Sequence, residues 1–238
     1  MSQFVRILFS LVLGSYSLSG FSMMQRHEFE QVNRIIFESY APLVAEKLKA
    51  QLEIKELWYD FGGAFKVDSA RKLMGESRYV VTLTGNIPQN LGMYMDGYAI
   101  VVCHEIGHIL GGAPLQKRGI SQWSSVEGQA DYYATNDCMW RYIKHADTYD
   151  VIHDFDRRSI NSCEEHFRYQ PDKILGCLRI MSGIKAMESY LKVDINKKDA
   201  SVVSSTLQNY PSKQCRIDTM VAGLLNQNRP TCWYKSLS

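Results

Sequence analysis

The chain has 238 residues, of which 45% are hydrophobic and 22% are charged, and its formal net charge is +2. This length and composition are those of a globular protein with one sizeable core, and they exclude a fibrous or disordered chain. The near-neutral charge gives no reason to expect nucleic acid or an anionic membrane surface as a partner.

The first twenty residues predict a secretory signal peptide. Arg6 precedes an apolar run from Ile7 to Leu13, and small residues follow that run. The run is too short to cross a bilayer core about 30 Å thick. We therefore expect export to the periplasm or the extracellular space, without stable membrane insertion of the mature chain. The alternative is that this segment forms an amphipathic first helix of the fold.

The rest of the chain, residues 21–238, is expected to form one domain that starts with helices. Apolar residues at steps of three and four between His27 and Leu57 predict one or two helices, with a break or a helix start at Pro42. The segment 78–85 is rich in β-branched residues and predicts a strand. A loop over residues 86–92 and a second short strand over residues 93–95 are expected to follow.

Two central helices are expected after this sheet. Asp96 is positioned to cap the first of them, which ends at Gly111, and Ser124 to open the second, which runs to about His145. Shorter helices are expected near residues 160–168, 172–190 and 216–226. The predicted fold class is therefore α+β, mostly helical with a small sheet, and the sequence leaves the oligomeric state open.

The segment "CHEIGHILGG", residues 103–112, predicts a metal site. His104 and His108 are four residues apart, so a helix places both on one face, within reach of one ion. Glu105 stands beside the first histidine, as the general base does in the H-E-x-x-H pattern of zinc hydrolases. Gly107 lacks a side chain and would let another element approach closely. The alternative is a core helix that contains two histidines by chance.

A third zinc ligand is expected from the segment "SSVEGQADYY". Glu127 and Asp131 are four residues apart, on one face of the second central helix. Glu127 is the candidate ligand, and Asp131 is a candidate to orient a ligand histidine through its other ring nitrogen. The alternative for Glu127 is a capping box with Ser124, in which the glutamate satisfies its own helix end.

These residues carry a family resemblance. H-E-x-x-H followed by E-x-x-A-D resembles the gluzincin metallopeptidases, in particular the CAAX prenyl protease-like family with its HExxH…ExxxD pattern. The segment "YPSKQCRI", residues 210–217, is similar to that family's H-P-x-x-x-x-R-I, with Tyr210 in place of the histidine. The resemblance implies a zincin-like fold, a bound Zn2+, Glu127 as third ligand and Asp131 as its helper. Because the chain has no transmembrane run, prenylated substrates are not expected.

Peptide hydrolysis also needs a donor for the oxyanion that forms on the substrate. Arg216 is the first candidate, and Tyr210 can supply an O–H at the position of the missing histidine. The alternative for Arg216 is a solvated cation at a helix start. Other possible donors are His153, His166, Tyr132 and Tyr133. The two tyrosines follow Glu127 by five and six residues, so they are expected to point away from the metal and to belong to the core. His27 and His145 are expected at the surface.

The six cysteines fit an exported protein, since their number is even and none forms a C-x-x-C pair. Structural disulfides are expected, with Cys103 left open between a disulfide and a buried free thiol. The predicted function is an exported zinc endopeptidase whose peptide or protein substrate pairs with an open edge strand at Tyr79–Thr84. The alternatives are an inactive binding module on a zincin scaffold and a disulfide-stapled binding protein without metal.

Overall fold

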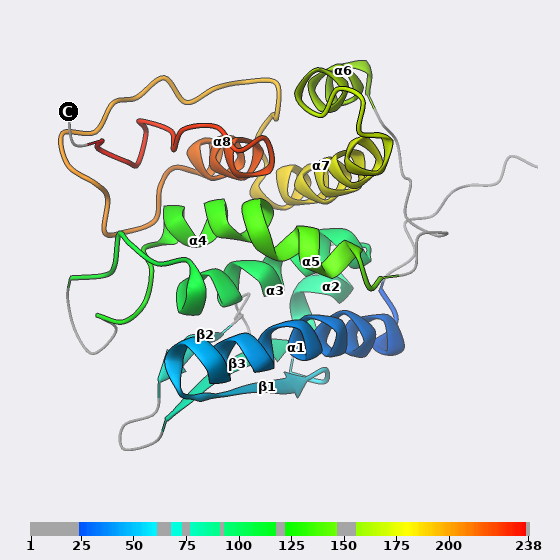
Figure 1. The fold of residues 1–238 in the computed structure, drawn as a ribbon, viewed down its shortest axis with the longest axis vertical. Coiled ribbons are helices and arrows are strands. Elements are labelled where there is room, and N and C mark those ends of the chain that lie inside the picture. The colour runs from blue at the N-terminus through cyan, green and yellow to red at the C-terminus, as the bar shows by residue number, and fades with distance from the viewer. Residues whose placement is uncertain are drawn as a thin grey trace, which may run out of the picture.

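The computed structural model describes residues 24–60, 68–72, 77–90, 93–117, 122–146 and 156–236 (Figure 1). The predicted signal peptide lies outside these residues. The described part is mostly helical with a small sheet, which confirms the α+β class. No helix in these ranges combines the length and the apolar character that crossing a bilayer requires.

Helix α1, Arg26–Leu48, packs one apolar face into the core. Its buried apolar side chains recur every three or four residues, as a single helix face requires: Phe29, Val32, Ile36, Tyr40 and Val44. The expected break at Pro42 is wrong, because the helix runs through it. Pro42 and Glu38 both lie on the exposed face, so water can take the place of the N–H that the Glu38 carbonyl lacks.

The sheet contains β1 (Gln51–Leu57), β2 (Asp68–Lys72) and β3 (Arg78–Thr84) in the order β1-β3-β2. β3 pairs parallel with β1 and antiparallel with β2. The strand expected at residues 78–85 is confirmed, but both of its edges carry partners. The expected open edge at Tyr79–Thr84 is therefore wrong.

The sequence of β1 has the apolar spacing of a helix and was therefore predicted as one. The chain leaves α1 through Lys49, whose φ of 51° is left-handed and ends the helix. Leu52, which fits the helical spacing, instead lies in β1 and is buried there. A short apolar segment with this spacing suits either structure, so periodicity alone could not decide.

The next segment differs from expectation at three points. Helix α2, Asn86–Asn90, occupies the expected loop, and residues 93–95 lead into helix α3, Met95–Leu110, instead of forming a strand. The N-cap of α3 is Tyr94, so the expected capping role of Asp96 is wrong. Asp96 is fully buried in the first turn, where it accepts hydrogen bonds from Nε and Nη2 of Arg179 at 2.8 and 3.0 Å.

The second central helix begins at Glu127, three residues later than expected. It runs without interruption through α4 (Glu127–Tyr133), a π-helical segment η2 (Ala134–Cys138) and α5 (Met139–Ile143). A π segment inserts an extra residue into a helix and shifts the faces that follow it. Asp137, in η2, accepts hydrogen bonds from the Tyr40 and Tyr133 hydroxyls and from Arg141.

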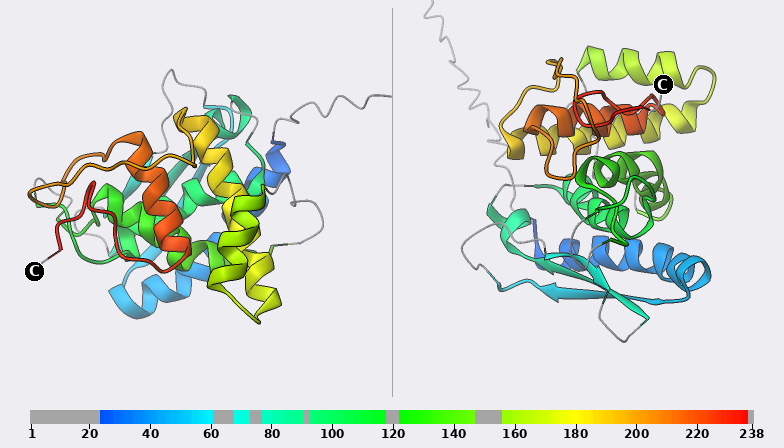
Figure 2. Two further views of the ribbon diagram at one scale, coloured as in Figure 1. Left: turned by 90° about the horizontal axis from the view of Figure 1, so that it is seen from above. Right: turned by 90° about the vertical axis from the view of Figure 1, so that its left-hand side faces the viewer.

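The remaining helices close the core from the other side. They are α6 (Arg157–His166), α7 (Pro171–Leu191) and α8 (Lys213–Leu224). The sheet and α1 form one layer, α3 with α4 and α5 the next, and α7 with α8 the third (Figures 1 and 2). Helix α3 is central, since it contacts α1, α4 and α7. Its residues are buried from Asp96 to Ile109 for that reason.

Three disulfides pair all six cysteines. Cys103–Cys138 joins α3 to η2, Cys163–Cys177 joins α6 to α7, and Cys215–Cys232 joins α8 to the C-terminal segment. The open question about Cys103 is thus decided in favour of a disulfide. Bridges of this kind persist in oxidising compartments and are typical of exported proteins.

Replacing Asp96 with asparagine tests whether this residue stabilises the protein as a helix cap or as the ion-pair partner of Arg179. Asparagine caps a helix as well as aspartate does, so a capping role predicts little change. Loss of the carboxylate charge leaves the buried Arg179 without its counter-ion, and we expect a loss of about 3–5 kcal/mol in the free energy of unfolding, measured in urea. Asp156→Asn is the control, since Asp156 caps α6 at a more exposed site. Equal small effects of both variants would contradict this assignment.

Candidate metal centre

Helix α3 brings His104 and His108 side by side near its C-terminal end. Their ring centroids are 4.7 Å apart, and the ring planes are nearly perpendicular, at 83°. Both side chains are buried, at 7% and 2% exposure, as is Glu105 at 5%. The spacing of four residues thus places both imidazoles side by side at the interface between α3 and α4.

Gly107 sets the distance between these two helices. A Cβ atom at this position would lie 2.6 Å from the carbonyl oxygen and 2.8 Å from the Cα of Ala130. Real Cβ atoms do not approach backbone so closely, so only glycine allows α4 to lie at its observed place. The expected close approach at Gly107 is confirmed, and α4 is the element that makes it.

Glu127 completes a three-residue group that can hold a metal ion. Its Oε2 lies 3.3 Å from Nε2 of His104, and its Oε1 lies 3.6 Å from Nε2 of His108. One ligand atom from each of the three residues can be chosen so that all lie within 4.8 Å of one another. Ligands about 2.0–2.1 Å from a tetrahedral zinc ion stand about 3.3 Å apart, so the group needs little movement to enclose one.

The hydrogen bonds of the imidazoles fit metal binding. Nδ1 of His104 lies 2.8 Å from Oδ1 of Asp131, and Nδ1 of His108 lies 2.8 Å from the carbonyl oxygen of Ser125. Both partners are acceptors, so each Nδ1 carries the proton, and in the neutral ring each Nε2 keeps a lone pair. Both Nε2 atoms face Glu127, whose buried Oε2 has no hydrogen-bond partner in the part of the chain that the structure describes. A cation between them satisfies all three groups at once.

The electrostatics of the two histidines differ. Burial lowers the pKa of His108 to about 4, and the neighbouring His104 adds to this shift. For His104, burial is outweighed by the Asp131 and Glu127 carboxylates, which raise its pKa to about 10. Burial likewise opposes charge on Asp131, but Arg216 and His104 hold its pKa well below the usual range. A metal ion would therefore compete with a proton for His104, while His108 is already neutral.

Asp131 links α8 to the candidate metal group, that is, to His104, His108 and Glu127. Its fully buried carboxylate accepts hydrogen bonds from Nε and Nη2 of Arg216 at 2.7 and 2.8 Å, in addition to the contact with His104. The guanidinium also lies 5.5 Å from the ring centroid of Tyr210. Arg216 is therefore not a solvated surface cation; it fixes the carboxylate that orients His104.

Tyr210 lies on the solvent side of this group. It is exposed, at 67%, yet burial of part of the side chain and the carboxylates of Glu127 and Glu105 raise its pKa to about 12. The side chain is thus close enough to both carboxylates to sense their charge. Of the candidate oxyanion donors that the structure describes, Tyr210 is the one that combines this proximity with access from solvent.

The capping alternative for Glu127 does not match the observed helix start. A capping glutamate occupies the third position of its helix, whereas Glu127 is the first residue of α4, after the N-cap Val126. Ser124 instead lies beside the second histidine, its Oγ 3.2 Å from Nδ1 of His108. Ser124 therefore contacts one of the candidate ligand histidines and does not cap α4.

Two contacts around the group could not be read from the motif. The Ser125 carbonyl that orients His108 is backbone, and no side-chain pattern marks it. Trp233 packs against the first turn of α4, where a Cβ on Gly128 would lie 2.3 Å from the indole ring. Adjacent Cys232 is bridged to Cys215, so Trp233 packs beside a disulfide.

The other histidines and tyrosines lie elsewhere. His27 and His145 are exposed, and the ring of His166 meets that of Phe167 edge to face at the end of α6. His153 lies outside the described residues. Tyr132 donates to the carbonyl of Gln227, and Tyr133 donates to Asp137, so both point away from the metal group as expected.

Comparison of the chain with protein-family models, with curated proteins and with solved structures finds no match. The chemical interpretation of the site consequently rests on its own geometry.

Glu127→Gln tests the third ligand. A neutral amide is a poor zinc ligand, and two histidines alone do not hold the ion tightly, so we expect most of the zinc to be lost on dialysis, as measured by elemental analysis. Asp131→Asn should lower the affinity about 10–100-fold through His104. Asp137→Asn, on the same continuous helix but outside the group, is the control and should keep its zinc. Full occupancy in Glu127→Gln would exclude Glu127 as a ligand.

Gly107→Ala tests the close approach of the helices. The added methyl group would push α4 away from α3, so both the unfolding free energy and the zinc affinity should fall. Gly112→Ala is a matched control just beyond the same helix: it has open space around it and only the strain of a φ of +74°. That strain costs about 1 kcal/mol and should leave zinc affinity unchanged. Equal zinc affinity in both variants would remove the geometric role of Gly107.

Proposed function

We propose that this chain is an exported, gluzincin-like zinc metallopeptidase that hydrolyses peptide bonds in a peptide or protein substrate. The observation that carries the proposal is the buried group of His104, His108 and Glu127, with Glu105 beside it and Asp131 behind it. Three protein ligands leave one coordination position open, as catalytic zinc sites do, whereas structural sites use four.

The charges around the group suit a divalent cation. A metal ion that binds Nε2 of His104 displaces its proton, so both histidines are neutral in the metal-bound group. The nearby ionisable groups are then the carboxylates of Glu105, Glu127 and Asp131 and the guanidinium of Arg216. Three negative charges against one positive charge leave a net charge of −2. Two imidazole nitrogens and one carboxylate are the ligand types that zinc takes, while calcium and magnesium prefer oxygen alone.

Besides holding the metal ion, the chain's own residues transfer the proton and orient a ligand. A bound zinc ion supplies Lewis acidity, which polarises the substrate carbonyl and makes water acidic near neutral pH. Glu105 adjoins a ligand without belonging to the ligand group, and its carboxylate takes the proton of the attacking water and passes it to the leaving amine. Asp131 holds the His104 ring in place through Nδ1.

Tyr210 and Arg216 have different roles in this mechanism. The Tyr210 hydroxyl donates a hydrogen bond to the substrate oxygen as negative charge develops on it. Arg216 was the first candidate for that role, but two of its N–H groups are held by Asp131. We therefore assign Arg216 to positioning, through Asp131 and His104, and Tyr210 to the oxyanion.

A substrate strand needs an edge other than β3. β2 is an outer strand of the sheet and contacts α3, the helix of the histidine pair. An extended peptide added to the outer edge of β2 would run alongside that helix. This edge replaces Tyr79–Thr84 as the proposed place for the substrate backbone.

Two alternatives remain as outcomes of the same experiments. A binding module on this scaffold would hold zinc without turning over any peptide, although a purely structural site has no use for Glu105. A disulfide-stapled binding protein would hold no zinc. Metal content separates the second alternative from the first, and a peptide library separates the first from the peptidase.

Glu105→Gln is the decisive variant for activity. It keeps the size of the side chain and the three metal ligands but cannot accept a proton, so zinc content should stay at the wild-type level. Turnover of a peptide library, followed by mass spectrometry, should fall by about 10²–10⁴-fold. Undiminished cleavage by the zinc-loaded variant would rule out this mechanism, and a zinc-loaded wild type that cleaves nothing would favour the binding module.

The same assay separates Tyr210 from Arg216. Tyr210→Phe removes only the hydroxyl, and we expect kcat to fall by about 10²–10³-fold at unchanged zinc affinity. Arg216→Lys should instead lower zinc affinity, because a lysine cannot hold the Asp131 carboxylate at two points. If Arg216→Lys loses turnover at full zinc occupancy while Tyr210→Phe does not, the two assignments must be exchanged.

A further inference from the structure

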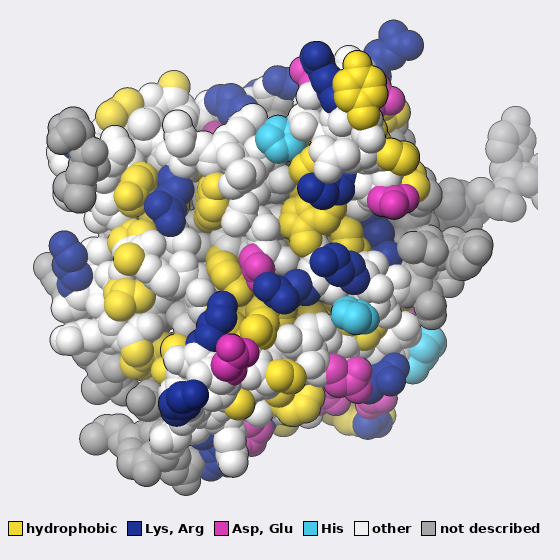
Figure 3. Space-filling view, viewed as in Figure 1, with side chains coloured by type: hydrophobic (Ala, Val, Ile, Leu, Met, Phe, Trp, Pro, Cys, Tyr) yellow, Lys and Arg dark blue, Asp and Glu magenta, His cyan; other side chains and the backbone are white. Residues whose placement is uncertain are grey.

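A cavity of about 800 Å3, separate from the metal group, lies between α5, α7 and the end of α8. Its volume falls in the range of small-molecule sites. None of the metal-group residues lines it. Much of its wall is apolar and comes from four segments of the chain: Trp140, Ile143, Phe167, Leu175, Gly176 and Leu224. Hydrophobic side chains gather between α5 and α7 on the face in Figure 3, with Lys and Arg side chains around them.

The apolar wall is held in place by close packing. The rings of Trp140 and Phe167 meet edge to face, with centroids 5.4 Å apart. A Cβ on Gly176 would lie 2.7 Å from the Trp140 ring and 2.9 Å from Ile143, so α7 and α5 touch directly here. Leu175, next to that contact, is 58% exposed at the cavity. The wall is therefore preformed, and binding need not order it.

The charged residues of the cavity give it a positive character. Lys144 and Lys173 line it and are exposed to solvent. Asp172 also lines it, in the first turn of α7, where the helix dipole stabilises a negative charge. Arg179, the remaining charged residue of the wall, is neutralised by buried Asp96. Among the described residues of the wall, two lysines thus stand against one aspartate, and one positive charge is in excess.

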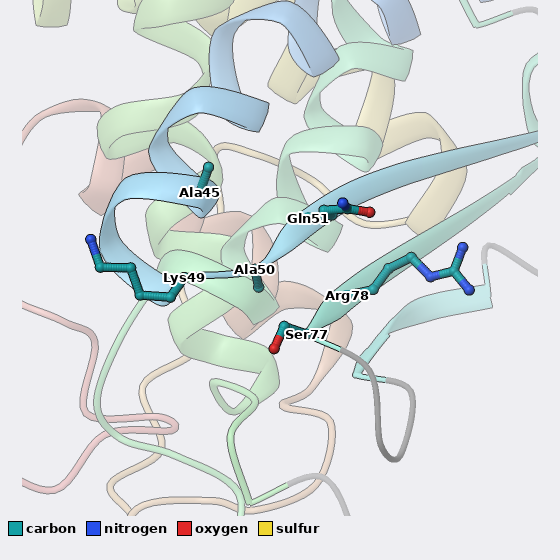
Figure 4. A pocket seen from close by; sticks show the side chains of 6 residues that line it. All are labelled: Ala45, Lys49, Ala50, Gln51, Ser77 and Arg78. Atoms are coloured by element: carbon teal, nitrogen blue, oxygen red, sulfur yellow. The ribbon is translucent and has the colours of Figure 1, made fainter.

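Comparison with another hollow of the molecule shows why an apolar wall is needed to select an amphipathic ligand. It lies where α1 meets β1 and β3, and it is lined by Ala45, Lys49, Ala50, Gln51, Ser77 and Arg78 (Figure 4). It also presents cations, but Arg78 is paired with Glu53 at 2.7 Å, and the described residues that line it include no aromatic or long aliphatic side chain. Positive charge without an apolar wall does not select an amphipathic ligand, so this hollow supplies control residues.

We infer that the cavity between α5, α7 and α8 binds a small amphipathic organic anion. Its hydrocarbon or aromatic body lies between Trp140, Phe167 and Leu175, and its carboxylate or sulfonate lies at Lys144 and Lys173. The inference is independent of the metal group, because the two sites share no residue.

Isothermal titration of the full chain with decanoate tests this assignment. Decyltrimethylammonium, which has the same chain length and the opposite charge, is the matched ligand, and both are used below their micelle-forming concentrations. Decanoate should bind at one site per chain, and the cation should bind at least about tenfold more weakly, since two lysines face the head group. Absence of decanoate binding, or equal binding of both ligands, would overturn the inference.

Variants place the binding event. Leu175→Glu and the double variant Lys144→Glu/Lys173→Glu should each weaken decanoate binding about tenfold or more, while Lys49→Glu in the hollow of Figure 4 should not change it. Leu175 and both lysines are exposed, so the variants are expected to fold, and circular dichroism checks this. Binding that is equally weakened by Lys49→Glu reports only net charge and contradicts the assignment. Concentration-dependent dimerisation abolished by Leu175→Glu, seen in sedimentation without ligand, would instead identify the surface as a self-association site.

Discussion

The contact of α3 with α4 at Gly107 is the constraint on which the rest of the site depends. With a Cβ atom at this point 2.6 Å from a backbone oxygen of α4, no other residue permits the observed distance. Glu127 and Asp131, on the facing side of α4, then reach the two histidines without any distortion of either helix. The bridge from Cys103, next to the first histidine, to Cys138 holds the same pair of helices together one turn beyond α4. Covalent and steric constraints thus act on one interface.

That interface also concentrates charge in a place where burial makes charge costly. An unpaired carboxylate as buried as Asp131 would be strongly destabilising, and the two N–H groups of Arg216 together with the His104 ring offset this cost. Among the described residues, Oε2 of Glu127 has no hydrogen-bond partner, and it lies 3.3 Å from Nε2 of His104. A divalent cation between these two atoms could contact both of them. The arrangement of the three ligand atoms around one point, together with the carboxylate behind His104, is what makes the group a candidate metal site.

Much of the helical part of the fold could be predicted from the sequence, because spacing along one helix is local information. The four-residue steps from His104 to His108 and from Glu127 to Asp131 fall on helices as expected. The errors arose where one residue suits two roles and a distant partner decides between them. Asp96 has the chemistry of a cap, but Arg179, far along the chain, takes it as an ion-pair partner. The central position of β3 likewise depends on pairing with β1 and β2, which no pattern within residues 78–85 can reveal.

One continuous helix carries residues of both sites. Glu127 and Asp131, in α4, face α3, whereas Trp140 and Ile143, after the π segment, pack against Gly176 of α7. An extra residue in a helix rotates all that follow by about 100° relative to an uninterrupted α-helix. The π segment thereby lets one rod of backbone present ligands to the histidine pair at one end and an aromatic wall to α7 at the other. Its side chains stabilise the irregularity, since Asp137 accepts hydrogen bonds from Tyr40 of α1 and from Arg141 one turn on. The residues before and after the π segment therefore face different neighbours, the histidines of α3 for Glu127 and Asp131 and α7 for Trp140 and Ile143.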